Sequence, residues 1–293
     1  MYTRQDIERL KPTRDFFVGI DSDGCAFPTM EVKHKECFIP NTVKHWKLQA
    51  VSRFAREAAE FVNLYSKWRG INRFPALIMV FDLLAERPEV TRAVALPDVE
   101  PLRAWSRRET TLGNATLKEE IRRTGDRLLE RVLAWSEAVN AAIEDMVVGV
   151  PPFPGVHESL ERLAGSADIM VVSATPGEAL EREWKEHGID CWVRIIAGQE
   201  LGSKKEHLEM AAGGTYPPER ILMIGDAPGD MAAARANGAL FFPVNPGAEE
   251  ESWQRFSQEG MDRFLRGTFA GEYEKRLVAE FEKLLPDTPP WKT

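Results

Sequence analysis

The sequence has few cysteines. There are three, Cys25, Cys37 and Cys191, and they include no C-x-x-C pair. Any disulfide scheme would leave one thiol over, so a disulfide framework is disfavoured. Thiols that stay reduced fit this pattern best, and we therefore expect a cytoplasmic protein.

Long apolar segments and an excess of positive charge are also lacking. The longest apolar run, residues 75–85, contains Asp82 and is much shorter than the roughly 20 residues that cross a bilayer. The first fifteen residues mix charges of both signs and lead into no apolar segment, so we expect no signal peptide. With 46 acidic and 38 basic residues the net charge is -8, which disfavours a polyanionic partner. We expect neither a membrane nor a nucleic acid as partner.

Apolar runs at the two ends of the chain predict an α/β fold. A chain of 293 residues, 43% of them hydrophobic, can bury a substantial core. Short apolar runs that stop at polar residues are typical of strands buried on both faces of a parallel sheet, and helical patterns alternate with them here. The sequence thus favours a doubly wound, Rossmann-like parallel sheet. The expected strands are 16–20, 169–172, 193–197, 221–224 and 239–244, and the expected helices are 156–164, 177–187, 204–212 and 229–237.

The middle of the chain, residues 40–150, is predicted to be an all-helical insertion. It is rich in Ala, Leu, Arg and Glu at helical spacing and offers no convincing strand. We expect a core domain of residues 1–39 and 151–246, a helical cap domain of residues 40–150, and a C-terminal helical extension, 247–293, that packs on the core. The expected helices of the insertion are 42–67, 74–86, 99–108, 117–123 and 126–146, and those of the extension are 249–265 and 272–284.

Two carboxylates follow the first expected strand. Asp21 and Asp23 lie in the sequence Asp-Ser-Asp-Gly, and strand ends in such sheets open onto the ligand crevice. One carboxylate can bind a metal ion and attack a substrate, while the other exchanges a proton with the leaving oxygen. Gly24 allows a sharp turn after them. On its own this motif is more often an ordinary turn.

Polar residues also follow later strands. The segment Ser173-Ala174-Thr175 offers a hydroxyl and backbone amides that could hold non-bridging phosphoryl oxygens, although a buried or capping serine is the simpler interpretation of Ser173 alone. Asp226 and Asp230 lie on a glycine-flanked loop and suit Mg²⁺, although Asp230 could simply cap the next helix. Ahead of the expected strand 221–224, two adjacent lysines, Lys204 and Lys205, begin a helix, where a positive charge opposes the helix dipole and calls for an anionic partner.

These four elements, in this order, resemble the signature of the haloacid dehalogenase (HAD) superfamily. The resemblance covers residues 16–27 and 155–244 and leaves the insertion and the C-terminal extension unmatched. It implies that Asp21 is the nucleophile and a Mg²⁺ ligand, and that Asp23 is the acid/base and binds the metal through its carbonyl. It also implies that Ser173 binds the phosphoryl group. The remaining implied roles are charge stabilisation by Lys204 or Lys205, with Lys204 slightly preferred, metal ligation by Asp226, and support from Asp230.

The resemblance further implies a Mg²⁺-dependent phosphatase that hydrolyses a small phosphorylated metabolite through an aspartyl-phosphate. Asp23 argues for phosphate esters over halides, because an alkoxide leaving from phosphorus needs a proton and a halide does not. A phosphosugar mutase or other phosphotransferase would use the same carboxylates and is left open, as is a non-catalytic binding protein on the same fold. Cys25 stands where the family usually has threonine or valine, and a packed thiol is the favoured interpretation.

The insertion leaves the core after Asp23 and returns before Ser173, so we expect a lid that closes over the crevice. Arg69 and Arg73 lie near a glycine between two expected helices, where they could meet an anionic substrate. For each of these residues taken singly, a solvated turn between helices is the favoured interpretation. The sequence does not indicate an oligomeric state.

Overall fold

The computed structural model describes residues 2–292, which fold as two compact units. The α/β unit consists of residues 2–30 and 149–285, and the helical unit of residues 31–148 and 286–292. The chain therefore crosses from one unit to the other three times, after Met30, Val148 and Leu285. Within residues 2–292, no helix combines the length and the apolar character needed to span a membrane.

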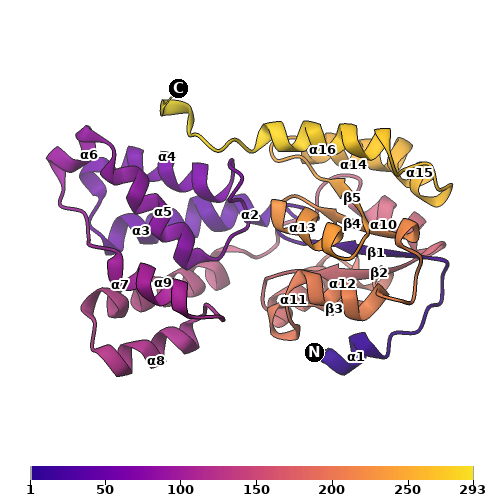
Figure 1. The fold of residues 1–293 in the computed structure, drawn as a ribbon, viewed down its shortest axis with the longest axis horizontal. Coiled ribbons are helices and arrows are strands. Elements are labelled where there is room, and N and C mark those ends of the chain that lie inside the picture. The colour runs from indigo at the N-terminus through magenta and orange to yellow at the C-terminus, as the bar shows by residue number, and fades with distance from the viewer. Residues whose placement is uncertain (1, 293) are drawn as a thin grey trace. The chain divides into compact units, whose positions relative to one another are not determined.

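A parallel sheet of five strands forms the centre of the α/β unit (Figure 1). Its order, β3-β2-β1-β4-β5, is the doubly wound arrangement that the sequence predicted. Ile20 lies opposite Val171 on one neighbouring strand and Ile224 on the other, so three strands end at the same edge. The strands are β1 (Phe16–Ile20), β2 (Ala167–Val172), β3 (Ile195–Ala197), β4 (Ile221–Gly225) and β5 (Leu240–Pro243).

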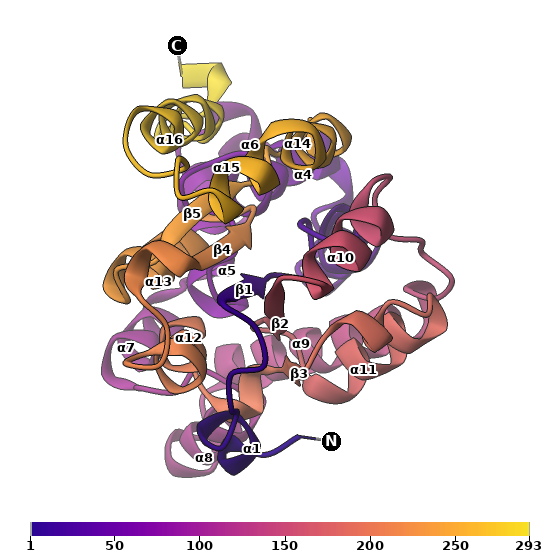
Figure 2. The same ribbon diagram turned by 90° about the vertical axis from the view of Figure 1, so that its right-hand side faces the viewer.

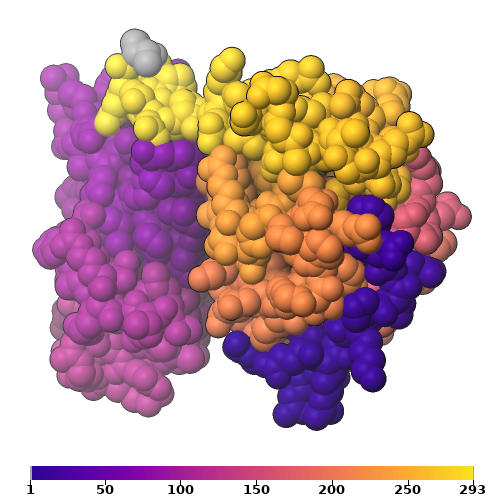
Figure 3. All heavy atoms as spheres, turned by 45° about the vertical axis from the view of Figure 1, so that its right-hand side comes forward, coloured from indigo at the N-terminus to yellow at the C-terminus, as the bar shows by residue number. Residues whose placement is uncertain are grey.

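Helices cover both faces of this sheet (Figure 2). They are α1 (Arg4–Glu8), α10 (Val156–Ala164), α11 (Gly177–Glu186), α12 (Lys204–Ala212), α13 (Pro228–Ala236), α14 (Glu249–Arg255), α15 (Met261–Leu265) and α16 (Glu272–Leu284). Alternate strand residues point to opposite faces, so Val18 and Ile20 join one core and Phe17 the other. The first core includes α10 and α11, and the second includes α12 and α13. In Figure 3 the indigo N-terminal segment lies on the surface of this unit, and α1 contacts α12.

The helical unit has a core of its own, built around aromatic side chains such as Phe74, Trp105 and Trp135. Asp126 caps its longest helix, α9, because its carboxylate accepts a hydrogen bond from the Leu128 amide at 2.8 Å. The elements are α2 (Thr29–Val32), which crosses the boundary between the units, a π-helical turn (Lys33–Phe38), α3 (Ile39–His45), α4 (Ser52–Asn63), α5 (Arg73–Ala85), α6 (Pro88–Ala93), α7 (Glu100–Arg108), α8 (Asn114–Thr124) and α9 (Arg127–Met146).

Some expected elements differ from the structure. The single helix expected over 42–67 is wrong, because α3 ends at His45 and α4 begins at Ser52. Lys47 between them has a left-handed backbone (φ 54°), which no helix continues, and the turn buries Trp46 against Phe81. The expected strand 193–197 begins only at Ile195, α2 and α6 were not expected, and a π-helical turn (Phe256–Gly260) interrupts the helix expected over 249–265.

The end of the chain belongs to the helical unit, whereas we expected the whole C-terminal extension to pack on the core. Trp291 provides the physical reason, because the Arg87 guanidinium lies 4.0 Å from the centroid of its ring. The Trp291 ring also meets Phe61 edge to face, with 5.7 Å between the ring centroids. Lys67 forms an ion pair with Asp287 of the same segment. These yellow residues lie on the purple helices of their own unit in Figure 3.

Candidate active site

Polar side chains gather at the edge where β1, β2 and β4 end. Asp21 follows β1, Ser173 follows β2 and Asp226 follows β4. The Asp21 amide donates to the Ile224 carbonyl at 3.0 Å, so the parallel pairing extends to the residue that we predicted to be the nucleophile. Ser173 is held in the same way by its amide, which donates to the Ala197 carbonyl at 3.0 Å. The sheet thus fixes the backbone of these residues at the crevice edge.

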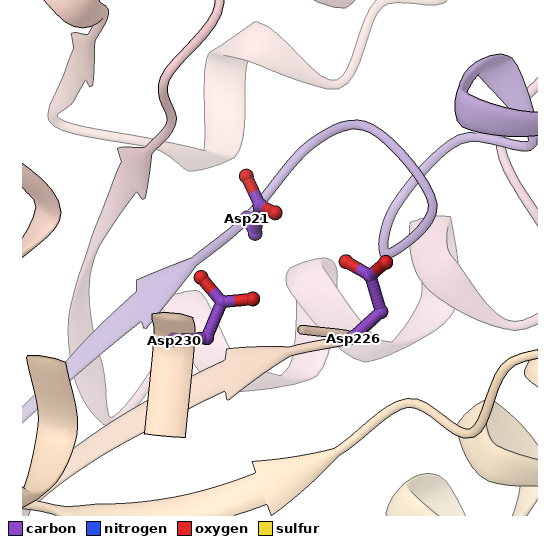
Figure 4. Close-up of side chains that lie close together, drawn as sticks. All are labelled: Asp21, Asp226 and Asp230. Atoms are coloured by element: carbon purple, nitrogen blue, oxygen red, sulfur yellow. The ribbon is translucent and has the colours of Figure 1, made fainter. Parts of the chain in front are cut away.

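Three of the predicted carboxylates meet there. Asp21, Asp226 and Asp230 are all buried, and each offers an oxygen within 4.8 Å of the other two. Figure 4 shows the three carboxylates close together, Asp21 and Asp226 on the loops after their strands and Asp230 at the start of α13. Buried carboxylates this close repel one another unless a positive charge lies between them. Their oxygens are the hard ligands that Mg²⁺ prefers, so the residues present fit a divalent cation.

Lys204 supplies one positive charge to this cluster. Its Nζ lies 2.8 Å from Oδ2 of Asp21 and 2.6 Å from Oδ1 of Asp230. Burial lowers the pKa of Lys204, but the carboxylates of Asp21 and Asp230 raise it by more than burial lowers it. The net shift of this pKa is therefore upward, and the ammonium stays charged. Burial raises the pKa of Asp230, and Lys204 opposes that rise. Three carboxylates and one ammonium leave two negative charges, which one divalent cation would balance.

The structure distinguishes the two adjacent lysines. Lys204 is the first residue of α12, whose start is capped by the Ser203 hydroxyl, and this placement aims its side chain at the carboxylates. Lys205 is exposed, and its backbone carbonyl accepts a hydrogen bond from Asn237 at 3.1 Å. Of the two lysines, Lys204 is therefore the one brought to the cluster.

Gly225 is a site residue whose role sequence reasoning missed. A Cβ at this position would lie 2.4 Å from Cβ of Asp230, so any side chain would displace that carboxylate. Asp230 is fixed further by the Ala227 amide, which donates to its Oδ2 at 3.0 Å. The capping role considered for Asp230 and its place in the acidic cluster therefore coexist. The only local signal for Gly225 was a glycine directly before the aspartate.

Asp23, the expected acid/base, has both carboxylate oxygens engaged by threonine hydroxyls. Thr175 donates to Oδ2 at 2.6 Å, and Thr29 donates to Oδ1. Gly24 has φ 79° and makes the expected sharp turn, closed by its amide donating to the Phe27 carbonyl at 2.7 Å. Neither threonine was assigned this contact from the sequence.

Cys25 lies beside the cluster as a packed thiol. It is fully buried, and its Sγ donates to the Ile224 carbonyl at 3.6 Å. Burial and the nearby carboxylate of Asp226 raise its pKa well above the ordinary value, so the reactive thiolate is disfavoured. All three cysteines of the chain are free thiols, in line with the expectation that no disulfide forms.

Arg69 and Arg73 belong to the helical unit, whereas the carboxylate cluster belongs to the α/β unit. Arg69 is only 2% exposed, and its Nη1 donates to the Leu64 carbonyl at 2.9 Å. Arg73 is partly exposed and donates to Ser136 and, at 2.7 Å, to Asn140. Burial lowers the pKa of Arg73 to about 10, so its guanidinium remains charged near neutral pH. A substrate-binding role for either residue stays a prediction.

Part of the chain matches a known protein family. Residues 100–244 match the model of the haloacid dehalogenase-like hydrolase family, and this range carries Ser173, Lys204, Asp226 and Asp230. Asp21 and Asp23 lie outside it and join those residues through the sheet. No curated protein matches the sequence.

Several solved structures are similar to this chain. A haloacid dehalogenase-like family hydrolase from Streptococcus pneumoniae is 14% identical, with 82% of this chain and 90% of that one covered and a TM-score of 0.43. A predicted phosphoglycolate phosphatase from Haemophilus somnus is 14% identical, with coverages of 79% and 86% and a TM-score of 0.43. A protein described as a phosphoglycolate phosphatase from Lactobacillus delbrueckii is 15% identical, with coverages of 86% and 99% and a TM-score of 0.49.

Since those likenesses are distant, the assignment depends on the family match and on the doubly wound sheet. The matched range includes strands β2 to β5, and β1, which Asp21 directly follows, pairs with two of them. On this basis residues 100–244 are similar to the haloacid dehalogenase-like hydrolases, and β1 with Asp21 completes the same sheet.

Proposed function

We propose that this protein is a Mg²⁺-dependent phosphatase that hydrolyses a small phosphate monoester through a phosphorylated Asp21. The observation that carries the proposal is the position of the Asp21 carboxylate. It is buried, lies within 4.8 Å of two other carboxylates and is paired with a lysine. A carboxylate held in this way among cation-binding groups is suited to accept a phosphoryl group.

The metal ion would be held by Asp21 and Asp226 together with the main-chain carbonyl of Asp23. Asp230 belongs to the same cluster of oxygens and also holds Lys204. When bound, Mg²⁺ supplies the positive charge that lets an anionic phosphate approach these carboxylates. Lys204 contributes to the same neutralisation, because its ammonium pairs with Oδ2 of Asp21, while Oδ1 accepts a hydrogen bond from the Ser22 amide at 2.8 Å.

The reaction proceeds in two steps. An Asp21 oxygen attacks phosphorus, the bond from phosphorus to the leaving oxygen breaks, and Asp23 gives its proton to that oxygen. Asp23 then takes a proton from a water molecule whose oxygen attacks the same phosphorus. The bond from phosphorus to Asp21 breaks, which releases inorganic phosphate, restores the Asp21 carboxylate and leaves Asp23 protonated for the next turnover. Ser173 would bind a non-bridging phosphoryl oxygen during both steps.

A halide substrate fits these residues less well than a phosphate ester. Asp23 has no role when the leaving group is a halide, since a halide leaves without a proton. Here Asp23 is present, and two threonine hydroxyls hold its carboxylate. Ester hydrolysis uses every charged group of the site.

Hydrolysis of 4-nitrophenyl phosphate tests this function. We expect turnover in Mg²⁺, loss of turnover after chelation, and recovery when Mg²⁺ is restored. Asp226→Asn should reduce turnover by at least about 10²-fold, because one metal-binding carboxylate is removed. Asp145→Asn, on the exposed surface of the helical unit, should behave as wild type. Calcium should inhibit, because its looser coordination spoils the geometry of attack.

Hydrolysis that persists in chelator, or an Asp226→Asn variant as active as wild type, would contradict the proposal. Full activity with Ca²⁺ in place of Mg²⁺ would also count against it. A panel of phosphorylated metabolites, assayed in the same buffer, would then identify the substrate. Phosphate appearing on an added sugar phosphate instead of in solution would identify a phosphotransferase.

A further inference from the structure

The carboxylate of Asp23 is held from the next strand of the sheet. Thr175, on the loop after β2, donates its hydroxyl to Oδ2 of Asp23 at 2.6 Å, although 152 residues separate the two in sequence. Asp23 is only partly buried, and the Thr29 hydroxyl binds its other oxygen, Oδ1, so the two hydroxyls together set the rotation of the carboxylate. The contact therefore fixes an orientation that the Asp-Ser-Asp-Gly turn alone does not.

Thr175 is itself fixed by its own loop and by the loop after β3. Its carbonyl accepts a hydrogen bond from the Gln199 amide at 3.0 Å, and its amide donates to the Ser173 hydroxyl at 3.3 Å. Gly198 approaches so closely that a Cβ there would lie 2.8 Å from the Thr175 carbonyl oxygen and 2.4 Å from the Gly177 nitrogen. The hydroxyl that reaches Asp23 is thus carried on backbone anchored by the ends of β2 and β3.

An ordinary structural role for this threonine would be to cap the helix that follows. The structure gives that role to another residue, since Glu200 accepts a hydrogen bond from the Gly177 amide at 3.0 Å at the start of α11. The Thr175 hydroxyl donates instead to Asp23, the carboxylate to which the proposed function assigns proton transfer.

We infer that Thr175 is a positioning residue that holds Asp23 in the orientation needed to protonate the leaving group. The inference rests on the proposed function and adds to it a residue outside the acidic cluster. Proton transfer requires the donor oxygen within hydrogen-bond distance of the leaving oxygen, and a displacement of about 1 Å can cost about 10²-fold in rate. Loss of the Thr175 hydroxyl should therefore weaken protonation without removing the nucleophile or the metal ligands.

The test compares Thr175→Val, which keeps the shape and removes the hydroxyl, with Thr175→Ser, which keeps the hydroxyl. Single-turnover phosphorylation is measured with phenyl phosphate, whose leaving group needs protonation, and with 4-nitrophenyl phosphate, whose leaving group needs it much less. We expect Thr175→Val to lose about 10-fold to 100-fold with phenyl phosphate and much less with 4-nitrophenyl phosphate. Thr175→Ser should restore most of the rate. Thr268→Val, on the exposed surface of the same unit, is the matched control.

Equal losses on both esters, or no loss on either, would overturn the positioning role. A wild-type protein that hydrolyses neither ester would refute the proposed function and leave the contact to be tested by structure. In that case a crystal structure of Thr175→Val should show the Asp23 carboxylate rotated away from its wild-type orientation. An unchanged carboxylate would overturn the inference independently of activity.

Discussion

Asp168 is a buried carboxylate near the start of β2, at the end of the strand away from Ser173. Its oxygens accept hydrogen bonds from the Thr13 hydroxyl at 2.6 Å and the Tyr216 hydroxyl at 2.7 Å, and from the guanidinium of Arg194. Burial raises the pKa of Asp168, but these bonds lower it below its ordinary value. The carboxylate thereby ties the segment before β1 to the neighbouring strand.

A pH-dependent loss of stability follows from this shift. Because the folded-state pKa lies below the unfolded value of about 3.9, the contribution of Asp168 is present above that pH and is lost as the pH falls further. We expect Asp168→Asn to lower the free energy of unfolding of the α/β unit by about 2–3 kcal/mol at pH 7, and to flatten its decline in acid. Urea unfolding followed by hydrogen exchange in β2 measures both effects.

Asp262→Asn is the control, because that carboxylate pairs with Arg162 at the surface, 3.6 Å away. Exposed pairs of this kind contribute about 0–1 kcal/mol. An Asp168→Asn variant as stable as wild type at pH 7 would show that the hydrogen bonds of Asp168 do not hold the segment in place.

At the scale of elements, the sequence predicts most of the sheet because its strands are buried on both faces. Continuous apolar runs that end at a polar residue located β1 at its observed bounds, and helical spacing did the same for α10, α12 and α16. Helices in the helical unit were harder to delimit. The break between α3 and α4 depends on Trp46 packing on Phe81, a tertiary contact that no local pattern contains.

At the candidate site, too, local sequence patterns predict some residues, whereas the roles of others depend on tertiary contacts. Asp21, Ser173 and Asp226 could be placed from sequence because each directly follows a strand, and parallel strands end at one edge. Gly225 and Thr175 could not be assigned, because their roles depend on an approach to Asp230 and on a hydrogen bond to Asp23 across the sheet. The sequence favoured Lys204 over Lys205 only slightly, and its ion pair with Asp21 depends on how α12 packs beside the sheet.

The helical unit is inserted into the α/β unit, whose two parts lie before and after it in the sequence. The helical unit leaves the α/β unit after Met30, seven residues beyond Asp23, and returns at Gly149, before Ser173. This connectivity supports the proposal that it acts as a cap that selects the substrate. Of the two arginines predicted to contact substrate, only Arg73 is partly exposed, so it is the better probe.

We expect Arg73→Ala to reduce kcat/KM at least about tenfold for the best substrate of a metabolite panel, and to change 4-nitrophenyl phosphate hydrolysis much less. The physical reason is that a small aryl ester needs few contacts beyond its phosphate. Because Arg73 also donates to Ser136 and Asn140, the melting temperature must be measured alongside. Arg107→Ala, at an exposed position of α7, is the control. Equal losses on both substrates would assign Arg73 to the structure of the helical unit alone.

The central claim is that Asp21 carries the phosphoryl group during turnover, and the most direct measurement is to trap it there. The protein is mixed with labelled phosphate ester and Mg²⁺, quenched in acid within one turnover, and digested for mass spectrometry. We predict a hydroxylamine-sensitive phosphoryl group on Asp21 that forms and decays at rates consistent with turnover, and none in Asp21→Asn, which should also be inactive. Turnover without such a group, a group on another residue, or near wild-type turnover by Asp21→Asn would contradict the account.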